Sequence, residues 1–428
     1  MALPAVTLPD PKMEAEGGID PLGVALIADR LADDMLPGMT QRMARPRFVS
    51  LMCTSSVITE ALDVRAEDGT PPHIAYEWLV VQSFAQLHDE VRRVPGMLKA
   101  KAALRDNVPL SPRRYLKSPT IFGFHGVYKT LGVALGVLDE DLRLRPAGER
   151  LLLTWEKATG LDGFLSGDKA SPGGRLRTRL RELVLEALDQ GFAAPPPNAV
   201  RDALQTTCRP DQIQAAESAV LRDLLDDARG GTRGEVFRLL VRSDVQKAFT
   251  GSYERPFLRF LEPIASPELR STLAAIEAFE RVIRPIQDGF DWIRFLSTKN
   301  RLEPLSADSF AEQAPPGLVK ELPRALADVL PAVVGRKAAP ELDVLVRDFE
   351  GVRTLQDLFT ATLRRHEHAQ RRKPPAGKRP WFERSPEGRA LVRPLYRLEE
   401  APSDIERGVY FYRTAAVASF LSDLGGMA

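Results

Sequence analysis

Apolar side chains recur at steps of three and four residues over a long stretch in the second half of the chain. They are Leu269, Leu273, Ile276, Phe279, Ile283, Ile286, Phe290 and Ile293. This spacing lasts for about three heptads and places all eight side chains on one face of an α-helix, in which Pro285 predicts a kink. Charge pairing beside this face is not clear, so we interpret it as a helix buried in a bundle. A coiled-coil partner surface is the alternative.

Helical spacing recurs along most of the chain, and few β-branched runs suited to strands accompany it. The sequence has 428 residues, more than the roughly 250–300 that a single core supports. Its 44% hydrophobic and 27% charged residues are typical of globular proteins. We therefore predict a mainly α, multidomain helical protein.

The expected order of elements between residues 111 and 158 is helix, helix, hairpin, helix. Ser118 and Pro119 suit a helix start, and a second apolar helix is expected to end near Gly136. A polar tip at 139–141 between short apolar runs predicts a hairpin, and the last helix follows Pro146. This is the order of a winged helix, and the segment LGVLDEDLRLRPAGERLL (135–152) resembles the end of many bacterial winged-helix modules.

A winged helix places its second helix and its wing on DNA. The contacts predicted on these two elements are His125, Tyr128, Lys129, Arg143 and Arg145.

Two segments are strongly basic, although the formal charge of the whole chain is only +1. Residues 92–117 contain eight basic side chains and one acidic side chain. Residues 364–397 contain eleven basic and three acidic side chains, a net excess of +8. Such densities neutralise phosphates, and Trp381, Phe382 and Tyr396 are candidate stacking surfaces. A solvated face is the alternative for both segments. The predicted DNA contacts in the second segment are Arg364, Arg365, Arg371, Arg372, Lys373, Lys378 and Arg379.

These patterns predict five segments, the last of which we expect to be a small α+β region. They are a flexible N-terminal arm (1–17), an N-terminal helical domain (18–110), the winged-helix-like module (111–165), a helical domain (166–340) and a basic C-terminal region (341–428).

Sequence signatures of common enzymes are absent. The motifs G-x-x-x-x-G-K-[ST], H-E-x-x-H and G-x-S-x-G do not occur, and Cys53 and Cys208 are isolated, which argues against a Cys-rich zinc site or a disulfide framework. We expect no cofactor, no metal and no enzymatic activity. If the chain is an enzyme, the residues expected to act on a phosphate substrate are His366, His368, Lys378 and Glu383.

No apolar run approaches the roughly 18–20 residues that cross a bilayer. Residues 1–17 lack the basic start and apolar core of a signal peptide. We therefore expect no membrane contact and a cytoplasmic location.

Four segments near the two ends of the chain are GIDPLG (18–23), LPGMTQRMARPRF (36–48), RRHEHAQRRKPPAGKRPWFE (364–383) and YFYRTAAVASFLSDL (410–424). These segments resemble uncharacterised protein families encoded in bacterial antiphage defence islands. The resemblance covers about a quarter of the chain and implies a cytoplasmic subunit of a multi-protein defence system. It adds Arg42, Arg45 and Arg47 to the contact candidates, although these arginines could equally orient the first helix by ion pairing.

Three hypotheses follow. The leading one is a non-enzymatic DNA-binding or scaffolding subunit of a defence complex, whose winged helix and C-terminal basic region meet the backbone of double-stranded DNA and whose partners are other subunits of that system. The second is a protein-interaction adaptor that does not touch DNA. The third is a nuclease with an unrecognised metal site.

Overall fold

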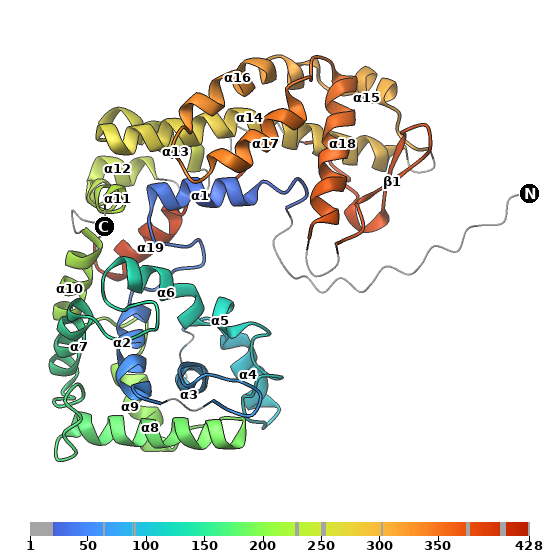
Figure 1. The fold of residues 1–428 in the computed structure, drawn as a ribbon. Helices are drawn as coiled ribbons and strands as arrows, with labels where there is room; N and C mark the ends of the chain where they lie inside the picture. The colour runs from blue at the N-terminus through green and yellow to red at the C-terminus, as the bar shows by residue number, and fades with distance from the viewer. Residues whose placement is uncertain are drawn as a thin grey trace, which may run out of the picture. The chain divides into compact units, whose positions relative to one another are not determined.

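The computed structural model describes residues 20–62, 65–87, 89, 91–226, 231–249, 254–300, 303–373, 377–402 and 408–426. Helices dominate these residues, which confirms the mainly α prediction, and Figure 1 shows the small two-stranded sheet that accompanies them. The arm predicted for residues 1–17 lies outside the described residues.

The chain divides into two compact units, and each unit combines segments that are far apart in the sequence. Unit 1 comprises residues 1–28 and 278–405, and unit 2 comprises residues 29–277 and 406–428. The division falls within helices α1 (Ala25–Met35) and α14 (Pro267–Lys299). It differs from the linear segments expected from the sequence, because apolar periodicity reports local structure and not which distant segments pack together.

Unit 2 is built around two helices that are buried on all sides. Every residue of α2 from Phe48 to Ile58 and of α3 from Ile74 to Phe84 is buried. Helix α2 packs against α6, α7 and α8, and α3 packs against α4, α8 and α9. The helices that lie wholly in this unit are α2 (Phe48–Thr59), α3 (Pro72–Ala85), α4 (Met97–Arg105), α5 (Pro119–Phe122), α6 (Phe124–Ala134), α7 (Pro146–Thr159), α8 (Pro172–Gln190), α9 (Asn198–Thr207), α10 (Ala215–Asp226), α11 (Thr232–Val241), α12 (Ser243–Ala248), α13 (Glu254–Leu261) and α19 (Thr414–Asp423).

Residues 111–158 contain helices α5, α6 and α7, with a turn between α6 and α7. The arms of this turn pair through one antiparallel bridge between Leu138 and Leu144. Backbone hydrogen bonds from Asp139 N–H to the Arg143 carbonyl and from Arg145 N–H to the Val137 carbonyl support the bridge. The predicted hairpin is thus a turn with one bridge, and the winged-helix assignment rests on the order of elements.

Unit 1 contains most of α14, whose eight predicted apolar side chains are all buried. The helix is continuous through Pro285, and no described helix is both long and apolar enough to cross a membrane. The other elements of unit 1 are α15 (Ala307–Gln313), α16 (Leu322–Ala332), α17 (Ala339–Phe349), α18 (Leu355–Arg371), β1 (Phe382–Arg384), β2 (Ala390–Val392) and two short 3-10 helices, η3 (Pro316–Val319) and η4 (Pro394–Tyr396).

The two strands lie in the C-terminal region for which the sequence predicts an α+β structure. They pair antiparallel, with Glu383 opposite Leu391. Helix α18 begins with a capping box in which the Thr354 hydroxyl and the Asp357 carboxylate bond each other's backbone N–H.

Candidate nucleic-acid interface

A buried carboxyl on α3 holds the segment that leads into α6. Glu77 is fully buried, and one of its carboxyl oxygens accepts a hydrogen bond from the Tyr115 hydroxyl, with 2.6 Å between the two oxygens. The other oxygen contacts Nδ1 of His125 at 2.9 Å and accepts the His125 backbone N–H at 3.1 Å. Residues 115 and 125, at the two ends of this segment, are therefore attached to one side chain.

Burial controls the charge of this network. It raises the pKa of Glu77 to about 7, although hydrogen bonds from Tyr115 and His125 lower that pKa in part. Burial also lowers the pKa of His125 to about 3 and that of His73, whose ring centroid is 5.1 Å away, to about 3. His125 is therefore neutral at physiological pH, and its contact with Glu77 is a hydrogen bond and not an ion pair.

The Nε2 atom of His125 lies 2.8 Å from the Ser55 hydroxyl, so Ser55, His125 and Glu77 follow the order of a nucleophile, a base and an orienting carboxylate. A cavity of about 390 Å³ adjoins this group, and its lining includes His73, His125 and Gly126 but not Ser55. Ser55 is itself 2% exposed, in the interior of α2. A nucleophile must face its substrate, so we interpret the arrangement as a hydrogen-bond network joining α2, α3 and α6.

Two glycines allow the close approaches that this network requires. Gly96 has φ +77°, and a Cβ there would lie 2.2 Å from the Tyr115 hydroxyl oxygen. A Cβ at Gly123 would lie 2.0 Å from the Glu77 carboxylate oxygen. The chain before α4, the loop after α4 and the end of α5 therefore converge at Tyr115 and Glu77.

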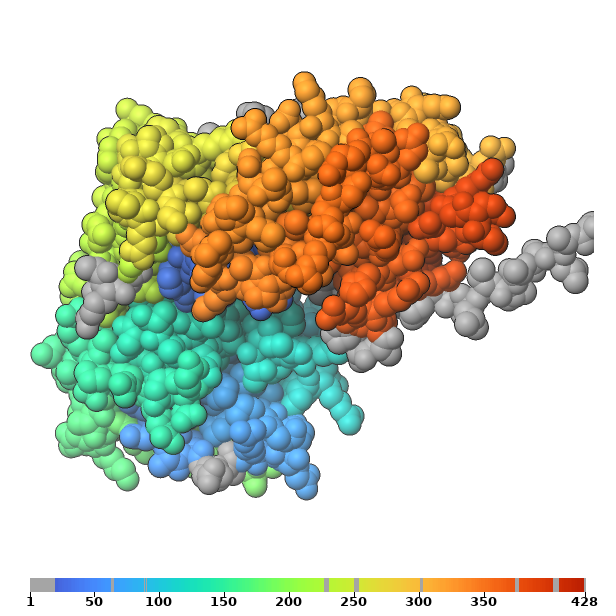
Figure 2. Space-filling view, turned by 45° about the horizontal axis from the view of Figure 1, so that its top comes forward, coloured from blue at the N-terminus to red at the C-terminus, as the bar shows by residue number. Residues whose placement is uncertain are grey.

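The exposed side chains next to these anchor points are mainly basic. Residues 92–117 carry eight basic side chains and one acidic one, a net charge of +7, and all eight are exposed. Figure 2 shows that this part of the chain, drawn in cyan and blue-green, reaches the surface of unit 2. We call the eight side chains the basic surface; they are Arg92, Arg93, Lys99, Lys101, Arg105, Arg113, Arg114 and Lys117.

Half of the basic surface has no countercharge. Arg105 pairs with its neighbour Asp106 at 3.2 Å, and Arg93 donates to Ser419. By contrast, four cations form no ion pair with any described residue: Lys99, Lys101, Arg113 and Arg114. Unpaired exposed cations are the groups that release counterions when they meet phosphates.

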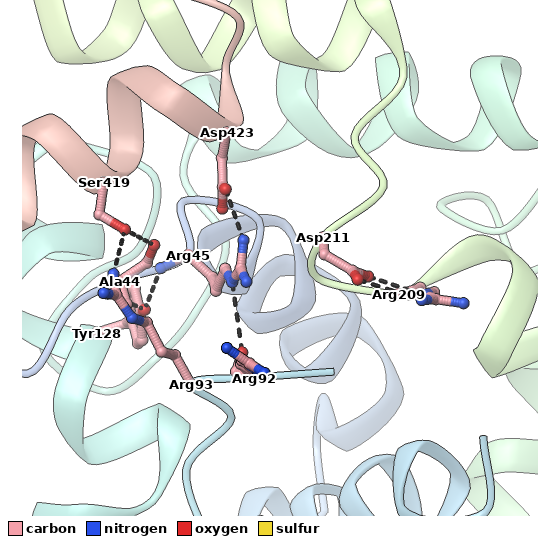
Figure 3. Close-up of polar contacts among 9 residues, drawn as sticks. All are labelled: Ala44, Arg45, Arg92, Arg93, Tyr128, Arg209, Asp211, Ser419 and Asp423. Atoms are coloured by element: carbon pink, nitrogen blue, oxygen red, sulfur yellow. Dashed lines mark hydrogen bonds and ion pairs between the residues drawn. The ribbon is translucent and has the colours of Figure 1, made fainter. Parts of the chain in front are cut away.

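Two of the DNA contacts predicted on α6 are wrong, because their side chains belong to the core. His125 is 3% exposed and bonded as described above, and Tyr128 is 1% exposed. The Tyr128 hydroxyl accepts the backbone N–H groups of Ala44 and Arg45, both at 2.9 Å, as Figure 3 shows. Only Thr130 and Ala134 are exposed on this helix, too few to read base edges in a groove.

The other three predicted contacts in this module reach solvent. Lys129 is half-buried and pairs with Glu140 at 3.5 Å, whereas Arg143 and Arg145 are exposed and have no ion pair among the described residues. The tip of the turn between α6 and α7, however, also carries Asp139, Glu140 and Asp141. These three acids outnumber the two arginines and would repel a phosphate backbone.

The C-terminal basic segment, with the larger predicted excess, is mostly occupied by its own structure. The prediction that Arg365 meets DNA is wrong, because it is 7% exposed and donates to the carbonyls of Leu22 and Gly23 and to Asp348. The Arg364 guanidinium donates to the Asp348 carbonyl.

Acidic side chains neutralise several other arginines of this segment. Arg371 and Arg384 share Glu367, at 3.5 and 3.3 Å, and Arg379 pairs with Glu383 at 3.0 Å. Arg372 and Lys378 remain exposed, and Lys373 is half-buried. Ion pairs and hydrogen bonds within unit 1 therefore engage much of the basic excess that the composition predicts for this segment.

The aromatic side chains proposed for stacking are also engaged. Trp381 and Phe382 are buried, and the ring of Tyr396 stacks on Trp381 at a centroid distance of 4.3 Å. They form an internal cluster and not a free stacking surface.

The residues predicted for phosphate chemistry do not form a catalytic group. His366 is fully buried, with Nδ1 on the Pro21 carbonyl and Nε2 accepting the Trp381 N–H. His368 is exposed and contacts Arg372, and Glu383 is the ion-pair partner of Arg379. Among the described residues, no cluster of three or more His, Cys, Asp or Glu side chains could hold a metal.

The three arginines near the start of unit 2 have different environments. Arg47 is 1% exposed and paired with Glu217, so of its two expected roles the structure favours ion pairing within the fold over contact with a ligand. Arg45 is half-buried and pairs with Asp423 at 2.6 Å (Figure 3). Arg42 is exposed, with its guanidinium carbon 4.3 Å from the centre of the Phe122 ring. Its location beside α5 had no sequence indication, because Phe122 is distant in the chain.

Comparisons with protein-family models, with curated proteins and with solved structures found no match to this chain.

Proposed function

We propose that the chain is a non-enzymatic DNA-binding subunit that contacts the phosphodiester backbone through the basic surface of unit 2. The observation that supports this most directly is the group of four exposed, unpaired cations, Lys99, Lys101, Arg113 and Arg114, on α4 and the following loop. Their attraction to phosphates is independent of sequence. The burial of His125 and Tyr128 argues against base reading by α6.

The resemblance of the chain's ends to defence-island families supports a role within a multi-protein antiphage complex. In such a complex this subunit would hold DNA while other subunits act on it. Its location would be the cytoplasm, where phage DNA is encountered.

Charge reversal tests the proposal. Binding of a random-sequence 30-base-pair duplex would be measured by fluorescence anisotropy across a salt series, for the wild type, the Lys99→Glu/Lys101→Glu variant and the Arg113→Glu/Arg114→Glu variant. Each variant is expected to lose at least about tenfold in affinity at low salt, with a shallower salt dependence.

The matched control is Arg238→Glu/Arg242→Glu, which makes the same change of charge at two exposed arginines of unit 2 that already pair with Asp226 and Asp244. This control should bind almost as the wild type does. An equal loss of affinity in the control and in both variants of the basic surface would show that only the net charge of the protein matters. Unchanged affinity in both variants of the basic surface would show that this surface does not bind DNA.

A protein-interaction adaptor that does not touch DNA is the second candidate, and it is favoured by the exposed apolar side chains of Leu98 and Ile121, which a protein partner would cover. Co-purification of a partner that survives nuclease treatment, with no DNA binding at low salt, would support the adaptor over the DNA-binding subunit.

A further inference from the structure

Exposed apolar side chains lie beside the unpaired cations of the basic surface. Leu98 on α4 is 85% exposed, and Ile121 and Phe122 on α5 are 56% and 39% exposed. On α4, Leu98, Lys101 and Arg105 are exposed and follow one another at steps of three and four residues, so they lie on one face of the helix.

The anchor points described above bring these elements to one region of unit 2. The Tyr115 side chain meets Gly96, which directly precedes α4, and reaches Glu77. Glu77 also touches Gly123, which directly follows Phe122. The segments that carry the apolar side chains and the cations at positions 113, 114 and 117 are therefore anchored at the same two side chains, Tyr115 and Glu77.

The planar guanidinium of Arg42 lies over the Phe122 ring. The Arg42 guanidinium carbon lies 4.3 Å from its centre, within the range of a cation–π contact, and Arg42 is exposed and has no acidic partner among the described residues. A guanidinium plane is itself a surface on which a nucleobase can stack.

We infer that the basic surface takes DNA with unpaired bases, whose backbone meets the cations and one of whose bases stacks on the Arg42–Phe122 pair. This inference rests on the proposed function and specifies its ligand. A duplex presents phosphates outward and keeps its base faces stacked inside, so it offers no apolar partner to Phe122 or Leu98. A single strand offers both a charged backbone and free base faces.

An anionic membrane also combines charge with apolar groups, but it fits this surface less well. Phe122 is only 39% exposed and its ring packs against the Arg42 guanidinium, so it does not project for insertion. Helices α4 and α5 have nine and four residues, which gives a small apolar area for membrane anchoring.

The experiment compares a 20-nucleotide oligothymidine with a duplex of the same length, using anisotropy at one salt concentration. Phe122→Ala is expected to weaken binding of the single strand about tenfold, as loss of one stacked base does, with less than a twofold effect on the duplex. Phe122→Trp should retain binding, because it keeps an aromatic face. Phe411→Ala, which removes a 56% exposed ring elsewhere in unit 2, should change neither affinity.

The outcomes separate this inference from the proposed function. Equal binding of both probes, with no effect of Phe122→Ala but a loss in Lys99→Glu/Lys101→Glu, overturns the preference for unpaired bases and leaves backbone binding intact. Absence of binding to either probe overturns both. Sedimentation with phosphatidylglycerol vesicles that Phe122→Ala abolishes, without a preference for the single strand, assigns the surface to a membrane and also overturns the inference.

Discussion

Arg47 and Glu217 form an ion pair of 3.0 Å between two side chains that are 1% and 0% exposed. The guanidinium also donates to the backbone carbonyls of Thr207, Arg209 and Gln212. It therefore ties the start of α2 to the α9–α10 connection, in the core of unit 2.

Removal of this guanidinium should be among the most damaging single changes in the chain. Arg47→Ala leaves Glu217 and three carbonyl groups buried without their partner, and we expect the free energy of unfolding to fall by about 3–5 kcal/mol. Urea unfolding measures this. Arg42→Ala, at an exposed arginine five residues earlier, should stay within about 0.5 kcal/mol, and a similar loss in both variants would contradict the assignment of Arg47 to the core.

The Glu77 carboxyl predicts a pH dependence of stability. Because burial raises its pKa to about 7 from 4.5, the folded chain keeps a proton that the unfolded chain releases between these values. The stabilisation is complete below pH 4.5 and is lost as the pH rises through 7, with a slope of at most about 1.4 kcal/mol per pH unit. His125 and His73, with lowered pKa values, act in the opposite direction and are present in wild type and variant alike.

Glu77→Gln removes this slope, so the stability advantage of the wild type over the variant should shrink between pH 4.5 and 7. Urea unfolding at pH 5, 6 and 7 measures the difference. Glu140→Gln, at an exposed acid, is the control, and an advantage of Glu77 that stays constant with pH would show that its pKa is not raised.

Substitution of Gly96 tests the contact between the start of α4 and Tyr115, which positions the basic surface. Gly96→Ala adds a Cβ that meets the Tyr115 hydroxyl and also places alanine at φ +77°, whereas Gly136→Ala introduces the same class of strain, φ +66°, with no atom within 4 Å. We expect Gly136→Ala to cost about 1 kcal/mol and Gly96→Ala to cost clearly more, as measured by thermal unfolding. Equal costs would mean that Tyr115 moves away freely.

The two basic segments should differ in their contribution to DNA affinity. Because Arg371 and Arg379 already pair with Glu367 and Glu383, the Arg371→Glu/Arg379→Glu variant should weaken duplex binding less than Lys99→Glu/Lys101→Glu does, in the same anisotropy assay. A larger loss in the C-terminal variant would move the interface to unit 1.

The sequence predicts well what depends on local spacing. The long apolar face of α14, the helices on either side of the 137–145 turn and the mainly helical class all follow from periodicity and turn residues. These features involve residues that are close in the chain.

The sequence predicts poorly which polar side chains are buried. His125 and Tyr128 belong to residue types that occur both at surfaces and in cores, and their partners Glu77 and Ala44 are 48 and 84 positions away. Arg365 finds its acceptors 342 and 343 positions away. A polar group is buried in a core only when partners of this kind satisfy its hydrogen bonds. Pairing over such distances leaves no local pattern in the sequence. Composition therefore overestimates how many basic side chains of the C-terminal segment are available to phosphates, and it underestimates the importance of residues 92–117.

Helix α19 completes unit 2 from the opposite end of the chain. Asp423 pairs with Arg45 across 378 positions, Ser419 bonds the Ala44 carbonyl, and the Phe420 ring stacks on Tyr128 (Figure 3 shows the polar contacts). During synthesis on a ribosome the α19 residues are absent until almost the whole described chain has emerged. The surfaces around Ala44 and Tyr128 therefore remain exposed until then. Contacts between segments so far apart in the chain carry a loop-closure entropy cost and are of the non-local kind that slows folding.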